Sequence, residues 1–343
     1  MQIKKINLSV LAIYIVGLIL VLIVPFLLPA KYYSDGNYIQ QLIIESANAP
    51  GSFQNTAYIY RLFGFESLFS DWLVGIIIFS FSLAIIIYFI KKYSINWCRL
   101  PLILLLVWTI FLAVFLGQYS KEFFALMVTG SLLYFSSTRK GLLVGLGLVI
   151  LYAIFFRDYW FLILAFFMVH LVLIRNHISL FKYIILFLLA TIVIFYLGHY
   201  VTDQYFSDAR FRINMSREGS PNAVTMLSNL VVNTSPITDM INTFYGWFML
   251  LIPIHLFRTG GIHHVIFAVF QFVNVILFVS AVKAILRYQV AMRVQVAIAW
   301  CLSFTFVEGM FEPDFGSFLK HELVILPMFF MVIMYRYSYL RLK

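Results

Sequence analysis

The stretch LLVGLGLVILYAIFFRDYWFLILAFFMVHLVLIR, residues 142–175, holds two apolar runs separated only by Arg157, Asp158 and Tyr159. Apolar runs of this kind recur from one end of the chain to the other, and each predicts a helix that crosses a hydrocarbon core about 30 Å thick. The short charged interruption predicts a tight turn at the membrane surface. The segment therefore predicts a hairpin of two membrane helices, near 142–156 and 159–174.

The rest of the chain repeats this pattern. Its residues are 63% hydrophobic and 11% charged, against about 25% charged residues in a soluble domain. We predict an all-α, polytopic membrane protein that forms a single integral domain over 1–343. About ten (10–11) transmembrane helices are expected, with two long outer loops near 30–70 and 201–242. The further spans are expected near 7–29, 71–90, 100–117, 122–136, 181–200, 263–283, 294–311 and 319–336.

Charge is divided between the two sides of this predicted topology. All fourteen carboxylates can be placed on one side: Asp35, Glu45, Glu66, Asp71, Glu122, Asp158, Asp203, Asp208, Glu218, Asp239, Glu308, Glu312, Asp314 and Glu322. The loops assigned to the other side hold only basic charges, among them Lys91, Lys92, Arg139, Lys140, Arg175 and Lys182. The positive-inside rule then predicts a bacterial inner membrane protein with both termini in the cytoplasm and an active site facing the periplasm. Topology explains the inward share of the net charge of +10, which is therefore no sign of nucleic-acid binding.

The segment 243–262 decides the topology of everything after it. Its first part, 243–257, is apolar, but it contains Pro253 and His255 and ends in the sequence Arg-Thr-Gly-Gly at 258–261. As a full span it would move Glu308, Glu312 and Asp314 to the basic side. A re-entrant segment preserves the charge rule, and such backbone is tolerated at membrane depth where protein buries it. The re-entrant interpretation is the one favoured here.

Ionisable groups gather at the predicted outer ends of helices, where they are costly unless they pair or line a wet cavity. Arginine and lysine suit a phosphate or pyrophosphate, and the candidates for binding it are Arg157, Arg210, Arg212, Arg217, Lys121 and Lys320. A carboxylate or histidine can deprotonate a sugar hydroxyl. The candidates for that role are Glu312 and His321, which are preferred, with Glu308 and Asp314. Asp35, Glu122 and Asp158 are expected to contact the acceptor or to be structural. A lipid-linked pyrophosphate glycan fits the cations, the acids and the apolar helices together.

In this pattern the chain resembles Wzy-type polysaccharide polymerases of O-antigen and capsule biosynthesis. The resemblance rests on the span number, the two enlarged outer loops and three short segments: Ser120-Lys121-Glu122, Arg157 at a span end, and Glu312-Pro-Asp314-Phe-Gly-Ser-Phe-Leu-Lys320-His321. The chain differs from several members of that family, because none of its Arg or His residues is followed ten residues later by Gly. The resemblance implies metal-independent, inverting transfer of a glycan from undecaprenyl pyrophosphate to a lipid-linked repeat unit. No cofactor is expected. The expected partners are undecaprenyl-pyrophosphate-linked oligosaccharides and membrane lipids, with a chain-length regulator as a candidate protein partner and no nucleic acid.

Two other classes fit parts of the sequence. A GT-C-type glycosyltransferase that uses a polyprenyl-phosphate sugar would place an acid early in the first outer loop, where Asp35 stands alone. A lipid-linked oligosaccharide flippase should carry charge on several helices at mid-span, whereas this chain concentrates charge at helix ends.

Overall fold

In a computed structural model of the protein, the chain is almost wholly helical. The structure describes residues 2–45, 51–65, 70–93, 99–217, 225–258, 261–288 and 290–339. The only strand-like pairing in these ranges is a single bridge between Met226 and Asp314. Six helices are long and apolar enough to cross a membrane, so the prediction of an all-α membrane protein is confirmed in this coarser form.

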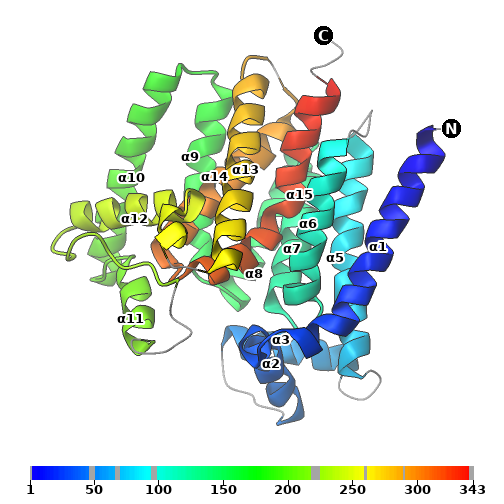
Figure 1. The fold of residues 1–343 in the computed structure, drawn as a ribbon. Helices are drawn as coiled ribbons and strands as arrows, with labels where there is room; N and C mark the ends of the chain where they lie inside the picture. The colour runs from blue at the N-terminus through cyan, green and yellow to red at the C-terminus, as the bar shows by residue number, and fades with distance from the viewer. Residues whose placement is uncertain are drawn as a thin grey trace. The chain divides into compact units, whose positions relative to one another are not determined.

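The elements in chain order carry the labels of Figure 1. They are α1 (Gln2–Leu27), η1 (Ala30–Tyr33), α2 (Ser34–Ile44), α3 (Ser52–Leu62), α5 (Asp71–Tyr93), α6 (Arg99–Leu116), α7 (Lys121–Phe135), α8 (Arg139–Phe155), α9 (Trp160–Arg175), α10 (Leu180–Thr202), α11 (Asp208–Ser216), α12 (Pro236–Leu251), η2 (Ile254–Arg258), α13 (Ile262–Ile285), α14 (Met292–Phe311) and α15 (Phe315–Tyr339).

The prediction of about ten spans was wrong, because only six described helices qualify as spans. The six helices that meet the length and hydropathy required of a span are α1, α5, α10, α13, α14 and α15. Four further predicted spans, near 100–117, 122–136, 142–156 and 159–174, are the helices α6 to α9. These have 15 to 18 residues. At 1.5 Å per residue they reach only about 22–27 Å, which is shorter than a hydrocarbon core of about 30 Å.

The chain divides into two compact units. Unit 1 comprises residues 1–161 and 323–343, and unit 2 comprises residues 162–322. The prediction of one integral membrane domain stays a prediction. Glu66 and Glu218 lie outside the described residues.

In unit 1 the helices α1, α5, α6, α7 and α8 pack side by side in antiparallel order (Figure 1). The first predicted outer loop is itself helical, because η1, α2 and α3 lie across the end where α1 finishes and α5 begins. We call this end of the bundle the loop end of unit 1. The helix α2 is amphipathic and buries Ile39, Leu42 and Ile43, a spacing that places the three side chains on one face.

In unit 2 the helices α9, α10, α13 and α14 are joined in pairs at one end by short connections. The opposite end, which we call the loop end of unit 2, carries α11, α12, η2 and residues 308–322. Figure 1 shows α12 lying across the long helices rather than along them. The helix α12 packs on α10 and α14. Ser235 caps its N-terminus and forms a capping box with Thr238, and the helix ends before Pro253.

The segment 243–262 does not carry the chain to the other end of unit 2. It divides into the last part of α12, η2 and the start of α13. Arg217, before this segment, is paired with Asp314, after it, at 2.7 Å. Both residues therefore lie at the loop end of unit 2, and the re-entrant interpretation stays a prediction.

Within each unit, the carboxylates that the structure describes and several of the basic residues lie toward opposite ends, and the membrane side of each end stays a prediction. The carboxylates of unit 1 and those of unit 2 all lie at, or within a few turns of, the loop end of their own unit. The other end of unit 1 carries Lys91, Lys92, Arg139 and Lys140, and the other end of unit 2 carries Arg175, Lys182, Lys283, Arg287 and Arg293.

Candidate functional site

Three of the four predicted catalytic residues meet at the loop end of unit 2. The Nδ1 atom of His321 lies 2.9 Å from Glu308 Oε2 and 2.5 Å from Glu312 Oε1. Glu308 is fully buried, and the side chains of Glu312 and His321 are 5% and 12% exposed. Because two carboxylates and one imidazole are in contact here, the protonation of each group depends on that of the other two, and the three titrate together. We call these three residues the Glu–His–Glu cluster.

The local sequence explains how the cluster forms. Glu308 and Glu312 stand four residues apart at the end of α14, so they share one face of the helix. The helix ends at Phe311 because Pro313 cannot continue it. Asp314 then accepts a hydrogen bond from the backbone of Ser317 at 2.8 Å, which caps the first turn of α15. The turn between the two helices folds His321, in the second turn of α15, back onto Glu308.

Electrostatics in the cluster oppose the effect of burial. Burial alone would raise the pKa of Glu312, but the charge of His321 and the hydrogen bonds from His321, Glu308 and Ser317 lower that pKa to about 2. Glu312 is therefore the carboxylate that stays ionised in the cluster. An ionised carboxylate beside an imidazole orients the ring and stabilises its protonated form.

The cluster also has the ligand types of a metal site. One ligand atom from each of Glu308, Glu312 and His321 lies within 4.8 Å of the other two. Two carboxylates and an imidazole are a donor set that holds divalent metal ions in many proteins. These three residues are the only ones in the described ranges that could hold a metal ion as a group of three or more.

Asp314, the fourth predicted catalytic residue, has structural partners. Besides capping α15, it is paired with Arg217, whose side chain is 46% exposed. This exposed pair lies two residues beyond Glu312, so a cation stands beside the cluster at the surface of unit 2. Arg217 is thus a predicted pyrophosphate ligand that the structure ties to the segment carrying the cluster.

Arg210 is buried, and its guanidinium donates hydrogen bonds to neutral groups. Its guanidinium donates to the carbonyl oxygens of Gly309 at 2.7 Å and Asn242 at 3.1 Å, and to Asn229 Oδ1 at 2.7 Å. Burial lowers the pKa of Arg210 to about 10, and the nearby charge of Asp239 opposes this shift. The side chain ties α11 to α12 and α14, which indicates a structural role rather than the predicted contact with pyrophosphate.

The close crossing of α12 and α14 depends on two glycines. A Cβ atom on Gly246 would overlap Arg210 Nη1 and the carbonyl oxygen of Gly309. A Cβ on Gly309 would press against the backbone of Trp247. Small residues allow helices to approach closely, and here they also leave room for the arginine.

Arg212 and Lys320 complete the predicted cations of unit 2. Arg212 is exposed and donates to Gln204 Oε1 at 3.2 Å, and Lys320 is half-buried in the second turn of α15. Both lie at the loop end, so the predicted assignment of their charges to that end is consistent with the fold.

In unit 1 the two predicted turn motifs come together. Arg157 donates to Glu122 Oε1 at 2.6 Å, and the two side chains are 5% and 0% exposed. Ser120 donates to the other oxygen of Glu122 at 2.8 Å, and Arg157 also donates to Tyr159 at 2.9 Å. Each of the two charges has an oppositely charged neighbour in the sequence, Lys121 beside Glu122 and Asp158 beside Arg157. The charge of Arg157 is instead matched by Glu122, and its binding to pyrophosphate stays a prediction.

The remaining predicted residues of unit 1 lie at its loop end. The ammonium group of Lys121 stands 3.8 Å from the ring centre of Phe53 in α3. Asp35 lies half-buried in the first turn of α2. Asp158 is exposed and accepts a hydrogen bond from the backbone of Tyr159. Lys121 and Arg157 belong to unit 1 and the Glu–His–Glu cluster to unit 2, so the predicted cations divide into two sets.

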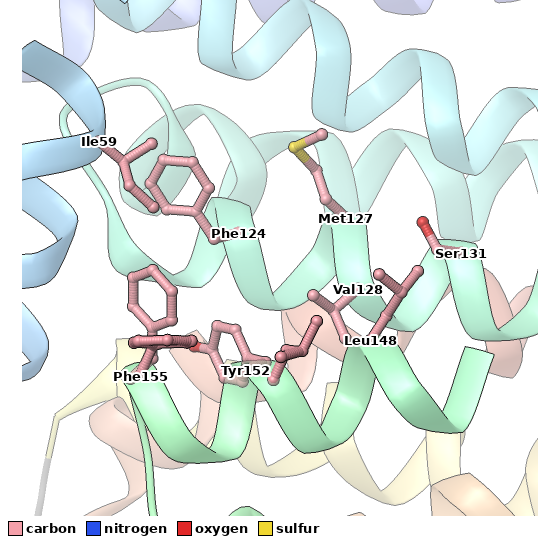
Figure 2. Close-up of a pocket in the computed structure, with 10 residues that line it drawn as sticks. Ile59, Phe124, Met127, Val128, Ser131, Leu148, Tyr152 and Phe155 are labelled. Carbon is pink, nitrogen blue, oxygen red and sulfur yellow. The ribbon is translucent and has the colours of Figure 1, made fainter. Parts of the chain in front are cut away.

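An apolar recess of about 300 Å³ lies between α7 and α8, near α3. Figure 2 shows Phe124, Met127 and Val128 on one side of it and Leu148, Tyr152 and Phe155 on the other. Its lining holds no charged residue. The recess therefore suits apolar groups rather than a phosphate or a sugar.

Sequence reasoning missed the polar residues that organise unit 2. Asp239 accepts hydrogen bonds from the backbone of Phe206 and Ser207 at 2.7 and 2.9 Å. Asn242 accepts from the backbone of Leu230 and Val231 at 2.9 and 3.0 Å. Gln271 and Glu322 meet in the interior. Polar residues three apart in an otherwise apolar helix, as at 239 and 242 or 271 and 274, were the available signal.

Comparison with models of known families, with curated proteins and with solved structures found no match.

Proposed function

We propose that the protein is a polysaccharide polymerase of the Wzy type, which transfers a glycan from undecaprenyl pyrophosphate to a lipid-linked acceptor. The observation that carries the proposal is the buried Glu–His–Glu cluster, with the exposed Arg217–Asp314 pair beside it. A base and a cation at the loop end of a membrane-helix bundle are what such a transfer needs. The candidate chemistry therefore lies in unit 2.

In the proposed reaction a hydroxyl oxygen of the acceptor attacks the anomeric carbon of the donor glycan. The bond from that carbon to the pyrophosphate oxygen breaks, and the lipid pyrophosphate leaves with the bonding electrons. The hydroxyl proton passes to the Glu–His–Glu cluster, in which Glu312 orients and stabilises His321. One displacement of this kind inverts the anomeric configuration and needs no metal.

Arg217 has the chemistry to stabilise the departing pyrophosphate. Its partner Asp314 is a single carboxylate at the surface, and an exposed pair of this type is worth about 0–1 kcal/mol. A doubly charged pyrophosphate can therefore compete for the guanidinium. Arg212 and Lys320 add positive charge at the same end of unit 2.

The experiment is polymerisation of a lipid-linked repeat unit by purified protein. Glu312→Gln and His321→Gln are expected to lower kcat by at least about a hundredfold, the lower range for loss of a general base. Asp203→Asn is the matched control, because Asp203 is an exposed acid of unit 2 with a φ of 53°, which asparagine tolerates. Wild-type rates in Glu312→Gln would overturn the proposal.

The proposed location is the bacterial inner membrane, with the loop ends facing the periplasm. Single cysteines at exposed Ser216 and Arg287, at opposite ends of unit 2, test the orientation. A membrane-impermeant thiol reagent should label intact cells at 216 and only permeabilised cells at 287. The reverse pattern would place the candidate site in the cytoplasm.

A GT-C-type glycosyltransferase is the second candidate function. The metal-ligand geometry of Glu308, Glu312 and His321 favours it, because such enzymes depend on a metal ion. Loss of activity in a chelator, restored by Mg²⁺ or Mn²⁺, would favour this candidate. Full activity in the chelator supports the polymerase.

A further inference from the structure

The middle of α13 exposes apolar side chains to the surroundings and buries two polar ones among its inward-facing residues. Ile266, Val269, Phe272 and Val273 are exposed, whereas Gln271 and Asn274 are 1% and 3% exposed. The two amides are three residues apart, so they lie on the same face of the helix. A membrane helix that turns its amides inward indicates a polar site inside the protein, because buried polar groups in a bilayer need partners.

Glu322 of α15 meets this polar face. Gln271 Nε2 donates to Glu322 Oε1 at 2.7 Å, and Glu322 is 8% exposed. Both residues lie within the segments of α13 and α15 that are long and apolar enough to span a membrane. Glu322 makes no ion pair in the described part of the chain. The contact therefore leaves a buried carboxylate that is held by one neutral amide.

Among the side chains of Glu322, Gln271 and Asn274, more acceptor atoms than donor atoms have no hydrogen-bond partner. Glu322 Oε2, Gln271 Oε1 and Asn274 Oδ1 are buried acceptors with no hydrogen-bond partner. Asn274 Nδ2 is the one donor group among the three residues that also has none. A proton on Glu322 would serve at most one of the acceptors. A cation bound beside the Gln271–Glu322 contact would offset the charge of the carboxylate, and Asn274, one turn along the same face of α13, could supply a further oxygen ligand.

We propose that Glu322, Gln271 and Asn274 bind a monovalent cation of the size of Na⁺ inside unit 2. The donors are all oxygen atoms, which hard cations prefer. One carboxylate and two neutral amides carry a single negative charge, which matches a monovalent ion, whereas a divalent ion would leave an uncompensated charge in a low-dielectric interior. The bound ion would link α13 to α15.

The side chains of this site have other partners than those of the Glu–His–Glu cluster, although His321 and Glu322 are adjacent in sequence. Successive residues of a helix point in directions about 100° apart. His321 meets Glu308 and Glu312 on α14, and Glu322 meets Gln271 on α13. The cation site therefore does not depend on the proposed function, and the two can fail independently.

The test is equilibrium binding of ²²Na⁺ to the full-length purified protein, with choline chloride holding the ionic strength constant. Saturable binding of about one Na⁺ per chain is expected, displaced by unlabelled NaCl and not by choline chloride. Glu322→Gln, which keeps the size of the side chain, and Asn274→Ala should each weaken binding by at least about tenfold. The absence of saturable binding in the wild-type protein would overturn the proposal.

Two control variants make the result specific. Gln295→Ala removes another buried amide of unit 2, one that donates to the carbonyl oxygen of Val290, and it should bind Na⁺ like the wild type. Glu312→Gln should also keep its Na⁺ binding while losing glycan transfer. Wild-type affinity in both Glu322→Gln and Asn274→Ala would show that Na⁺ binds elsewhere and would reject the site. Protein folding is checked in each variant by its unfolding temperature in choline chloride.

Discussion

Arg157 and Glu122 form a buried ion pair between positions that are 35 residues apart, with 2.6 Å between Nη2 and Oε1. The pair joins the turn before α7 to the turn after α8. The hydroxyl of Tyr60 supports it from α3, because it donates to the carbonyl oxygen of Ser120 at 2.9 Å. Burial raises the pKa of Tyr60, which keeps that hydroxyl protonated.

Removing one partner of this pair should destabilise unit 1 more than removing both. Arg157→Ala removes the cation that is paired with the buried carboxylate of Glu122, so a loss of about 3–5 kcal/mol in the free energy of unfolding is expected. A double change to Arg157→Met and Glu122→Met should recover much of that loss. Denaturant titration in detergent measures both. Equal losses in the single and double variants would mean that the charge pairing is not what stabilises the turn.

Gly246→Ala should destabilise unit 2, because its Cβ would overlap Arg210 and the carbonyl of Gly309. A loss of about 1–3 kcal/mol is expected for overpacking of this type. Gly147 in α8 is the matched control, because a Cβ there would meet nothing within 4 Å. Gly147→Ala should leave stability unchanged or raise it by up to about 1 kcal/mol. Similar effects of the two substitutions would contradict the close crossing of α12 and α14.

Alanine variants of Arg210 and Arg212 should differ in unfolding temperature, because only Arg210 is buried. Arg210→Ala removes four hydrogen bonds from the interior of unit 2 and should lower the unfolding temperature markedly. Arg212→Ala removes an exposed contact and should leave the unfolding temperature unchanged. Thermal unfolding of the two variants, measured side by side, checks the difference. A stable Arg210→Ala protein that has lost glycan transfer would restore Arg210 as a substrate ligand.

Acid should destabilise unit 2 through Glu312. Its pKa falls from an ordinary 4.5 to about 2 in the folded protein. A group with a lowered folded pKa contributes stability above its unfolded pKa, and this contribution is lost as the pH falls from about 4.5 toward 2. The unfolding temperature of the wild type should therefore fall faster below pH 4.5 than that of Glu312→Gln. Parallel pH profiles would contradict the lowered pKa.

The sequence predicted the class of fold and much of the composition of the candidate site. Glu308, in an apolar run, required a partner, and the short turn through Pro313 brought His321 to it. Helix geometry and a tight turn fix the positions of residues that are close in sequence, which is why these side chains meet, and their catalytic roles stay a prediction.

Other features depend on packing between distant segments, which one sequence does not show. Nothing in the separate motifs at 120–122 and 157–159 indicates that Arg157 prefers Glu122 to its neighbour Asp158. Arg210 looked like a surface ligand because its loop is polar, yet it is buried under α12. The number of spans was too high because apolar composition marks short helices and full spans alike.

The two amide hydrogens held by Asn242 lie in a stretch without helix or strand, at Leu230 and Val231. Amide protons in irregular segments ordinarily exchange with solvent quickly. Here the rate should follow the opening of α12, because the acceptor is a side chain of that helix. In heavy water, the amide hydrogens of residues 230 and 231 should exchange as slowly as those of α12. The exchange rate of these loop amides would therefore report how often α12 opens.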